Sequence, residues 1–154
     1  MKPEDLSPNQ FQNMYDRLKS DGGFSMDLAG NEPRVGYMVS LPGSEQQIRS
    51  TKVAPAHIEE FARKNAHLLK GPGGKGKFLG GWDGGKETSL DVSNNIKPKS
   101  KVAKQYGKKV ADADARTSAM DLSIARNQES AWDVKRNKEV PNKAFNPRGR
   151  RGNV

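Results

Sequence analysis

The segment that most constrains the fold is residues 77–93, which have the pattern of a β-hairpin. Large side chains stand at alternate positions on both halves, including Phe78 and Trp82 before the centre and Leu90 after it. Between the halves, residues 83–85 read Asp-Gly-Gly, and glycine readily adopts the positive φ angles that tight hairpin turns require. The sequence therefore predicts two antiparallel strands here.

Helical and strand patterns recur on both sides of this hairpin. Ser7-Pro8 predicts a helix start, because serine caps the first turn and proline is well tolerated at the first helical position. Apolar residues recur every three or four positions along residues 102–124, which predicts a long helix. Gly107 destabilises a helix by about 1 kcal/mol, so this helix could begin only at Lys108. The other expected elements are a helix at 8–21, a second hairpin with strands at 24–28 and 35–41, a helix from 55 that ends before 71, and a strand at 130–134.

This order of elements predicts an α+β fold. We expect a mostly antiparallel sheet of about five strands covered by two or three helices, followed by a flexible basic C-terminal tail. Residues 1–21 are assigned to an N-terminal amphipathic helix, residues 22–141 to the α+β domain and residues 142–154 to the tail. The hydrophobic content of 32% and mean hydropathy of -0.92 are low for a compact fold, which indicates that part of the chain is tail or orders only against a partner.

The positive charge is concentrated in the second half of the chain. The net charge is +9; residues 1–69 carry 8 Lys and Arg against 9 Asp and Glu, whereas residues 70–154 carry 19 against 9. Such a half attracts, in order of preference, nucleic acid phosphates, anionic lipid or an acidic protein surface. The candidate binding residues are Lys70, Lys75, Lys77, Lys97, Lys99, Lys101, Lys104, Lys108, Lys109, Lys143, Arg148, Arg150 and Arg151.

Catalytic and metal-binding patterns are weak. The chain has no cysteine, and its two histidines, His57 and His67, would lie about 80° apart and nearly three turns apart on one helix, too far to share a metal ion. The Gly- and Lys-rich residues 70–77 lack the spacing of a P-loop and are expected to form a mobile loop or a non-specific backbone contact. We expect no catalytic residue, metal or cofactor. The alternative is a small metal-independent nuclease or toxin-like domain, in which His57 or His67 acts with Glu59 or Glu60 as general acid and base.

Membrane association is not expected either. No apolar run approaches the roughly 20 residues of a membrane-spanning helix, and the first five residues do not resemble a signal peptide. We therefore expect a soluble protein without a membrane partner.

Several short motifs are similar to those of one known family. They are Phe78-Leu79-Gly80-Gly81-Trp82, Leu90-Asp91-Val92-Ser93, Arg126-Asn127-Gln128 and Trp132-Asp133-Val134, with further likeness around Gly23-Phe24 and residues 36–40. Over residues 22–141 the chain resembles small α/β domains encoded by tailed bacteriophages and prophages, some attached to minor head proteins. The resemblance implies a phage context and no particular catalysis. It leads us to expect a non-enzymatic accessory protein, present in the virion and, before assembly, in the host cytoplasm. Its expected partners are other virion proteins and DNA, and several copies are expected to assemble.

Overall fold

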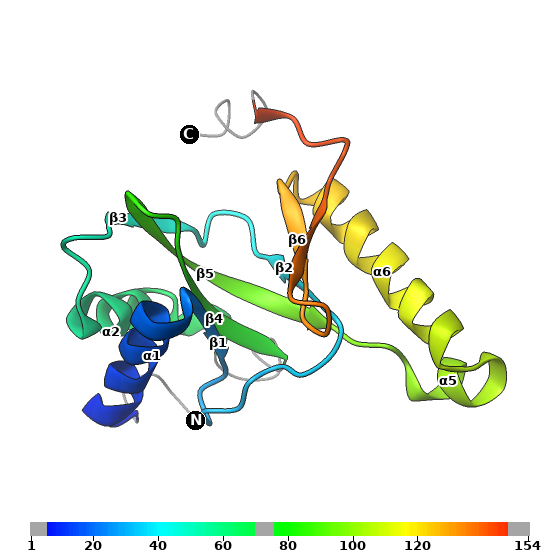
Figure 1. Ribbon diagram of the computed structural model, residues 1–154, viewed down its shortest axis with the longest axis horizontal. Helices are drawn as coiled ribbons and strands as arrows, with labels where there is room; N and C mark the ends of the chain where they lie inside the picture. The colour runs from blue at the N-terminus through cyan, green and yellow to red at the C-terminus, as the bar shows by residue number, and fades with distance from the viewer. Residues whose placement is uncertain (1–5, 70–75, 148–154) are drawn as a thin grey trace. The chain divides into compact units, whose positions relative to one another are not determined.

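The computed structural model describes residues 6–69 and 76–147 (Figure 1). In chain order the elements are α1 (Pro8–Asp21), β1 (Gly23–Met26), β2 (Tyr37–Ser40), β3 (Gln46–Arg49), α2 (Pro55–Lys64), α3 (Ala66–Leu69), β4 (Lys77–Asp83), β5 (Glu87–Ile96), α5 (Ser100–Tyr106), α6 (Lys108–Ala125), β6 (Ser130–Asp133) and β7 (Lys138–Pro141).

The predicted α+β class with mostly antiparallel strands is confirmed. The described residues form seven strands and five helices, more than the five strands and two or three helices expected. The extra strands are β3 and β7, whose sequences lack a clear alternation of apolar residues. The extra helices arise because two predicted helices are interrupted, at Asn65 and at Gly107. The long helix α6 therefore starts at Lys108, the later of the two starts allowed from the sequence.

The chain divides into two compact units. The first consists of residues 1–32 and 43–93, and the second of residues 33–42 and 94–154. The predicted domain at residues 22–141 thus contains parts of both units. Segment 33–42, which carries β2, interrupts the sequence of the first unit and belongs to the second.

In the first unit the strand order is β1-β4-β5, with β3 on the other side of β5. The predicted hairpin at residues 77–93 is confirmed, and the N–H of Gly84 donates to the carbonyl of Glu87 at 2.9 Å across its turn. The predicted second hairpin is wrong, because β1 pairs with β4 instead of with residues 35–41. Phe24 explains this pairing, since a β-carbon on Gly81 would lie 2.3 Å from its ring. The glycine lets the aromatic ring lie across the neighbouring strand.

Two helices supply most of the remaining core of the first unit. Helix α1 packs against α2 and β1, and its C-terminus ends in the left-handed Gly22, whose N–H donates to the carbonyl of Leu18. Burial of the apolar face of α1 in this way stabilises the first unit mainly through the hydrophobic effect. The fully buried large side chains of this unit are Phe11, Met14, Leu18, Ile58, Phe61, Leu79, Leu90, Val92 and Thr88.

In the second unit the strand order is β2-β6-β7, and α6 packs against β2 and β6 (Figure 1). The core cluster is Tyr37, Val39, Ala115, Ala119, Ala131 and Val140. Alanine on the buried face lets the helix approach the strands closely. Several apolar residues of the periodic pattern at 102–124 are exposed and lie on another face of the helix.

The start of the predicted tail belongs to the folded part of the second unit. The buried Asn142 side chain donates to the carbonyl of Gln128 at 2.8 Å. Asn127 and Asn146 exchange two hydrogen bonds, with N···O distances of 2.7 and 2.8 Å. Residues 142–146 are therefore bonded to the end of α6 and its following loop. The tail prediction for residues 148–154 lies outside the described residues.

Arg126 connects the end of α6 to β2 and the end of β5. Its guanidinium donates to the carbonyls of Val39 and Ser40, both at 3.3 Å, and to the side-chain oxygen of Asn94 at 2.8 Å. Partial burial lowers the pKa of Arg126 from its usual value. The Arg-Asn-Gln motif at 126–128 thus braces the unit through its side chains and backbone.

Candidate nucleic-acid interface

Six lysines of the second unit form an exposed, acid-free segment around α5. No Asp or Glu occurs between residues 94 and 109. Within the described part of the chain, none of the six ammonium groups has a hydrogen bond or an ion pair. Their charge is therefore available to a ligand. The six are Lys97, Lys99, Lys101, Lys104, Lys108 and Lys109, and all are exposed.

Helix α5 lies against α6 and presents this charge on its exposed side. None of its seven residues is buried, and Tyr106 at its end is 62% exposed. Gly107, with φ of +94°, breaks the helical path before α6. This break gives α6 its own N-terminus, whose first turn holds Lys108 and Lys109 and no acid. Cations at a helix N-terminus oppose the helix dipole at a cost of about 0.3 to 1 kcal/mol each, so these lysines do not serve helix stability.

The turn between β6 and β7 brings two further exposed lysines beside α6, held there by Arg136, whose own charge is balanced by Asp112 and Asp133. Arg136 lies in this turn and pairs with Asp112, one turn along α6 from Lys108, with an Nη2···Oδ2 distance of 3.3 Å. Lys135 and Lys138 flank Arg136 and are exposed. The three residues thereby extend the surface formed by α5 and the start of α6. We call this set the basic surface: the six lysines named above with Lys135, Arg136 and Lys138.

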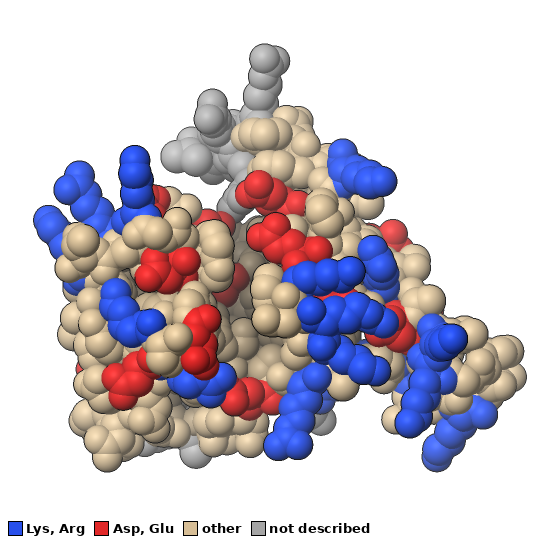
Figure 2. Space-filling view, viewed as in Figure 1, with Lys and Arg blue, Asp and Glu red and all other residues tan. Residues whose placement is uncertain are grey.

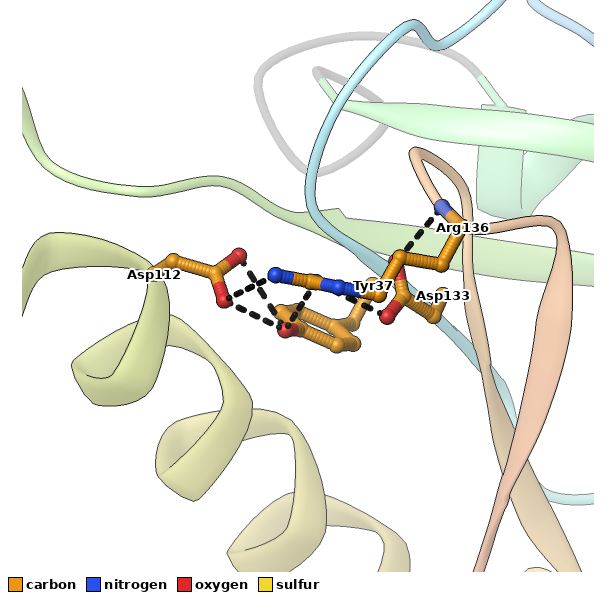
Figure 3. Close-up of polar contacts among 4 residues, drawn as sticks. All are labelled: Tyr37, Asp112, Asp133 and Arg136. Atoms are coloured by element: carbon orange, nitrogen blue, oxygen red, sulfur yellow. Dashed lines mark hydrogen bonds and ion pairs between the residues drawn. The ribbon is translucent and has the colours of Figure 1, made fainter. Parts of the chain in front are cut away.

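A polar cluster fixes the position of this turn (Figure 3). The buried Tyr37 hydroxyl lies 3.1 Å from both carboxylate oxygens of Asp112 and donates to that group. Arg136 donates to the hydroxyl at 3.4 Å and to the buried Asp133 at 3.0 Å. Asp133 also accepts a hydrogen bond from the backbone N–H of Arg136 at 3.1 Å. The cluster therefore ties α6, β2 and the β6–β7 turn together.

The protonation states of the cluster suit a structural role. Burial, followed by the hydrogen bond to Asp112, raises the pKa of Tyr37 above its ordinary value. The hydrogen bonds to Asp133 and Asp112 raise the pKa of Arg136. Tyr37 thus stays protonated and Arg136 stays charged at neutral pH, and a tyrosine in this state is a poor nucleophile or base.

Charges on α6 are segregated around the helix. At 100° per residue, Lys109 and Arg116 project within about 20° of one another, and so do Asp114 and Asp121. The two pairs are about 140° apart around the axis. Asp114 and Asp121 thus lie away from the side of α6 that carries Lys109, whereas Asp112, about 60° from Lys109 around the axis, is paired with Arg136.

The two units differ strongly in charge. The second carries 16 Lys and Arg against 6 Asp and Glu, whereas the first carries 11 against 12. Figure 2 shows Lys and Arg side chains gathered over α5, the start of α6 and the β6–β7 turn, at the lower right of the view. The basic half predicted from the sequence corresponds closely to the second unit.

The other predicted binding residues are not all brought together. Lys77 begins β4 in the first unit and is partly buried, whereas Lys143 follows β7 in the second and is exposed. Lys70, Lys75, Arg148, Arg150 and Arg151 lie outside the described residues. Sequence reasoning missed Lys135, Arg136 and Lys138. The local density of three cations in four residues was the available signal.

The residues of the alternative nuclease hypothesis have other contacts. The ring nitrogen Nδ1 of His57 accepts a hydrogen bond from the backbone N–H of Ala54 at 3.0 Å and closes the first turn of α2. Glu59 forms an ion pair with Arg63 at 2.8 Å. His67 is exposed on α3. Neither histidine is hydrogen-bonded to Glu59 or Glu60 in the described structure.

Metal-binding clusters and membrane spans are both absent from residues 6–69 and 76–147. These ranges contain no cluster of three His, Asp or Glu side chains placed to hold a metal ion. Within the same ranges, no helix is both long and apolar enough to cross a membrane.

Comparison with known proteins gave no relative. No protein-family model, no curated protein and no solved structure matches this chain.

Proposed function

We propose that the protein is non-enzymatic and binds the phosphate backbone of nucleic acid through the basic surface. The observation that supports the proposal most directly is the set of six exposed lysines without partners in the described structure, continued by the β6–β7 turn. Phosphate groups would replace water around these ammonium groups and release counterions from the nucleic acid. This interaction needs positive charge on one side of the protein and little base-specific geometry.

The surface suits backbone contact better than sequence reading. Tyr106 is the one well-exposed aromatic side chain beside these lysines among the described residues, and extended single-strand sites use several aromatics. We therefore expect comparable affinity for unrelated sequences.

The proposal includes a phage context. It is supported by the resemblance described above, and in this context the ligand would be DNA handled by a virion-associated accessory protein docked on other virion proteins. Immunodetection in purified particles of the encoding phage or prophage tests the location. Presence of the protein only in the lysate would reject a virion component without affecting nucleic acid binding.

Fluorescence anisotropy with a labelled DNA duplex and a labelled RNA, across a salt series, tests the binding itself. The triple variant Lys101→Gln, Lys104→Gln, Lys108→Gln should bind more weakly. For every phosphate that the variant no longer neutralises, the slope of log K against log salt should become shallower by about 0.9.

A matched control removes the same charge from the first unit. The variant Lys52→Gln, Lys64→Gln, Lys86→Gln neutralises three exposed lysines of that unit and should retain wild-type binding and slope. Equal weakening in both variants would show that only net charge matters and would reject the basic surface. Cleavage of the RNA, abolished by His57→Ala or His67→Ala, would instead support the nuclease alternative.

A further inference from the structure

Helix α6 carries a second apolar stripe that its own unit does not bury. Val110 is 48% exposed and Ile124 is 52% exposed, and Ala113 and Thr117 between them are also exposed. With Met120, which packs partly against the core cluster, these residues are spaced alternately by three and four positions. Two heptads of this spacing form the seam of a two-stranded coiled coil.

The stripe is distinct from the face that holds α6 in its own unit. That face consists of Ala111, Ala115, Ala119 and Ser123, all buried. Val110 and Ile124, at the two ends of the stripe, are about half exposed and do not belong to the core cluster. Since the helix is already formed and held in place, a partner that covers the stripe would not have to order it.

The charges beside the stripe select the partner and its direction. Lys109 and Arg116 lie on one flank, at the g positions of the heptads, and Asp114 and Asp121 lie on the other flank, at the e positions. All four are exposed and unpaired within the described residues. In a parallel pair of helices each g residue meets the e residue five positions further along the partner helix. Lys109 would thus meet Asp114 of a second copy, and Arg116 would meet Asp121.

We propose that a second copy of this chain docks on the α6 stripe, with the two α6 helices parallel and related by a two-fold axis. An antiparallel pair would place cations opposite cations along one flank and carboxylates opposite carboxylates along the other, which is unfavourable. The exposed lysines of α5 meet at one end of the parallel pair and repel each other. Their repulsion is screened beyond about 8 Å at physiological salt, whereas the flanking pairs are in direct contact.

The expected association is weak. The stripe spans residues 110–124, about 21 Å of helix at 1.5 Å per residue, and Ala113 and Thr117 bury little area. An interface of this size lies at the small end of specific protein contacts, so we expect dimers at micromolar or higher concentration. The inference does not depend on nucleic acid binding, and it is tested without nucleic acid.

Sedimentation velocity of the full chain over a concentration series at 150 mM salt, compared among charge variants, tests the pairing. Arg116→Asp alone and Asp121→Arg alone should each weaken dimerisation about tenfold, because each places like charges together at two symmetric positions. The double variant should restore it. Residues 116 and 121 project about 140° apart on one helix, so rescue cannot come from a pair within one chain. A double variant as weak as the singles would overturn the proposed pairing.

Cysteine crosslinking tests the direction. The chain has no cysteine, so Ile124→Cys introduces a unique thiol that would face its own copy in a parallel pair. Oxidation should give a disulfide-linked dimer of this variant. Crosslinking only between Ile124→Cys and Val110→Cys chains would show an antiparallel pair. A wild-type protein that stays monomeric at millimolar concentration would reject the dimer.

Discussion

Removing the hydroxyl of Tyr37 measures how strongly the polar cluster holds helix α6 to its strands. Tyr37→Phe keeps the buried ring and deletes the group that donates to Asp112 and accepts from Arg136. The carboxylate and guanidinium of those two residues remain paired with each other at 3.3 Å. The substitution therefore removes the hydrogen bonds of the hydroxyl and leaves the ion pair.

The expected decrease in unfolding free energy is about 1.5 kcal/mol. A hydrogen bond to a charged group contributes about 1.5 to 3 kcal/mol. The low end applies because the O···O distances of 3.1 Å exceed the roughly 2.6 Å of the strongest bonds to carboxylates. With an m-value of about 1 to 3 kcal/mol per molar urea, the midpoint should fall by about 0.5 to 1.5 M.

Urea unfolding followed by tryptophan fluorescence measures the change. Trp82 belongs to the first unit and is 58% exposed, so a Trp82→Phe background leaves Trp132 of β6 as the reporter of the second unit. Tyr106→Phe is the control, since removing an exposed hydroxyl should change stability by less than about 0.5 kcal/mol.

A double-mutant cycle with Asp112→Ala isolates the pair. The two substitutions together should cost about 1 to 1.5 kcal/mol less than the sum of the single changes. Additive effects, or a Tyr37→Phe protein as stable as wild type, would refute the assignment of this cluster as the brace of α6.

Three further predictions concern Tyr37, Gly36 and Arg126. The pKa of Tyr37 is raised in the folded state, so the contribution of its hydroxyl to the unfolding free energy is complete below pH about 10. That contribution is lost as the pH rises through the folded pKa. In urea titrations between about pH 9 and 11, wild type should therefore lose more stability than Tyr37→Phe. Gly36→Ala should lower the unfolding free energy by considerably more than about 1 kcal/mol, because Gly36 has φ of +87° and a β-carbon would lie 2.4 Å from the carbonyl oxygen of Ile96. Gly43→Ala is the control, since its β-carbon would meet no atom within 4 Å. It should cost about 1 kcal/mol in thermal unfolding. Arg126→Ala should lower the unfolding free energy by about 1 to 2 kcal/mol, because it removes hydrogen bonds to three oxygens. A change below about 0.3 kcal/mol would contradict its bracing role.

Local signals in the sequence were sufficient where neighbouring residues decide the structure. Asp-Gly-Gly at 83–85 located the β4–β5 turn, Ser7-Pro8 located the start of α1, and Gly107 marked the break before α6. Pairings between distant strands could not be predicted in this way. Strand β1 pairs with β4 because the Phe24 ring fits over Gly81, a contact between residues 57 positions apart.

The candidate interface was only partly predictable for the same reason. The lysine segment is continuous in the sequence and was identified from charge alone. The contribution of Arg136 depends on Asp112 and Tyr37, which precede it by 24 and 99 residues. The buried face of α6 was also hidden, because alanine gives a weak hydrophobic signal beside the valine and isoleucine of the exposed stripe.

The split of the second unit between residues 33–42 and 94–154 has a consequence for biosynthesis. Val39 and Arg126 are 87 residues apart, which takes roughly 4 to 17 s of translation at about 5 to 20 residues per second. During that interval the apolar strand Tyr37-Met38-Val39 has been synthesised, but α6 and β6 have not. An apolar strand whose β6 edge and α6 face are both uncovered promotes aggregation and attracts chaperones. An early stop after residue 93 would release a chain in which the first unit is complete and that strand permanently lacks its partners in the second.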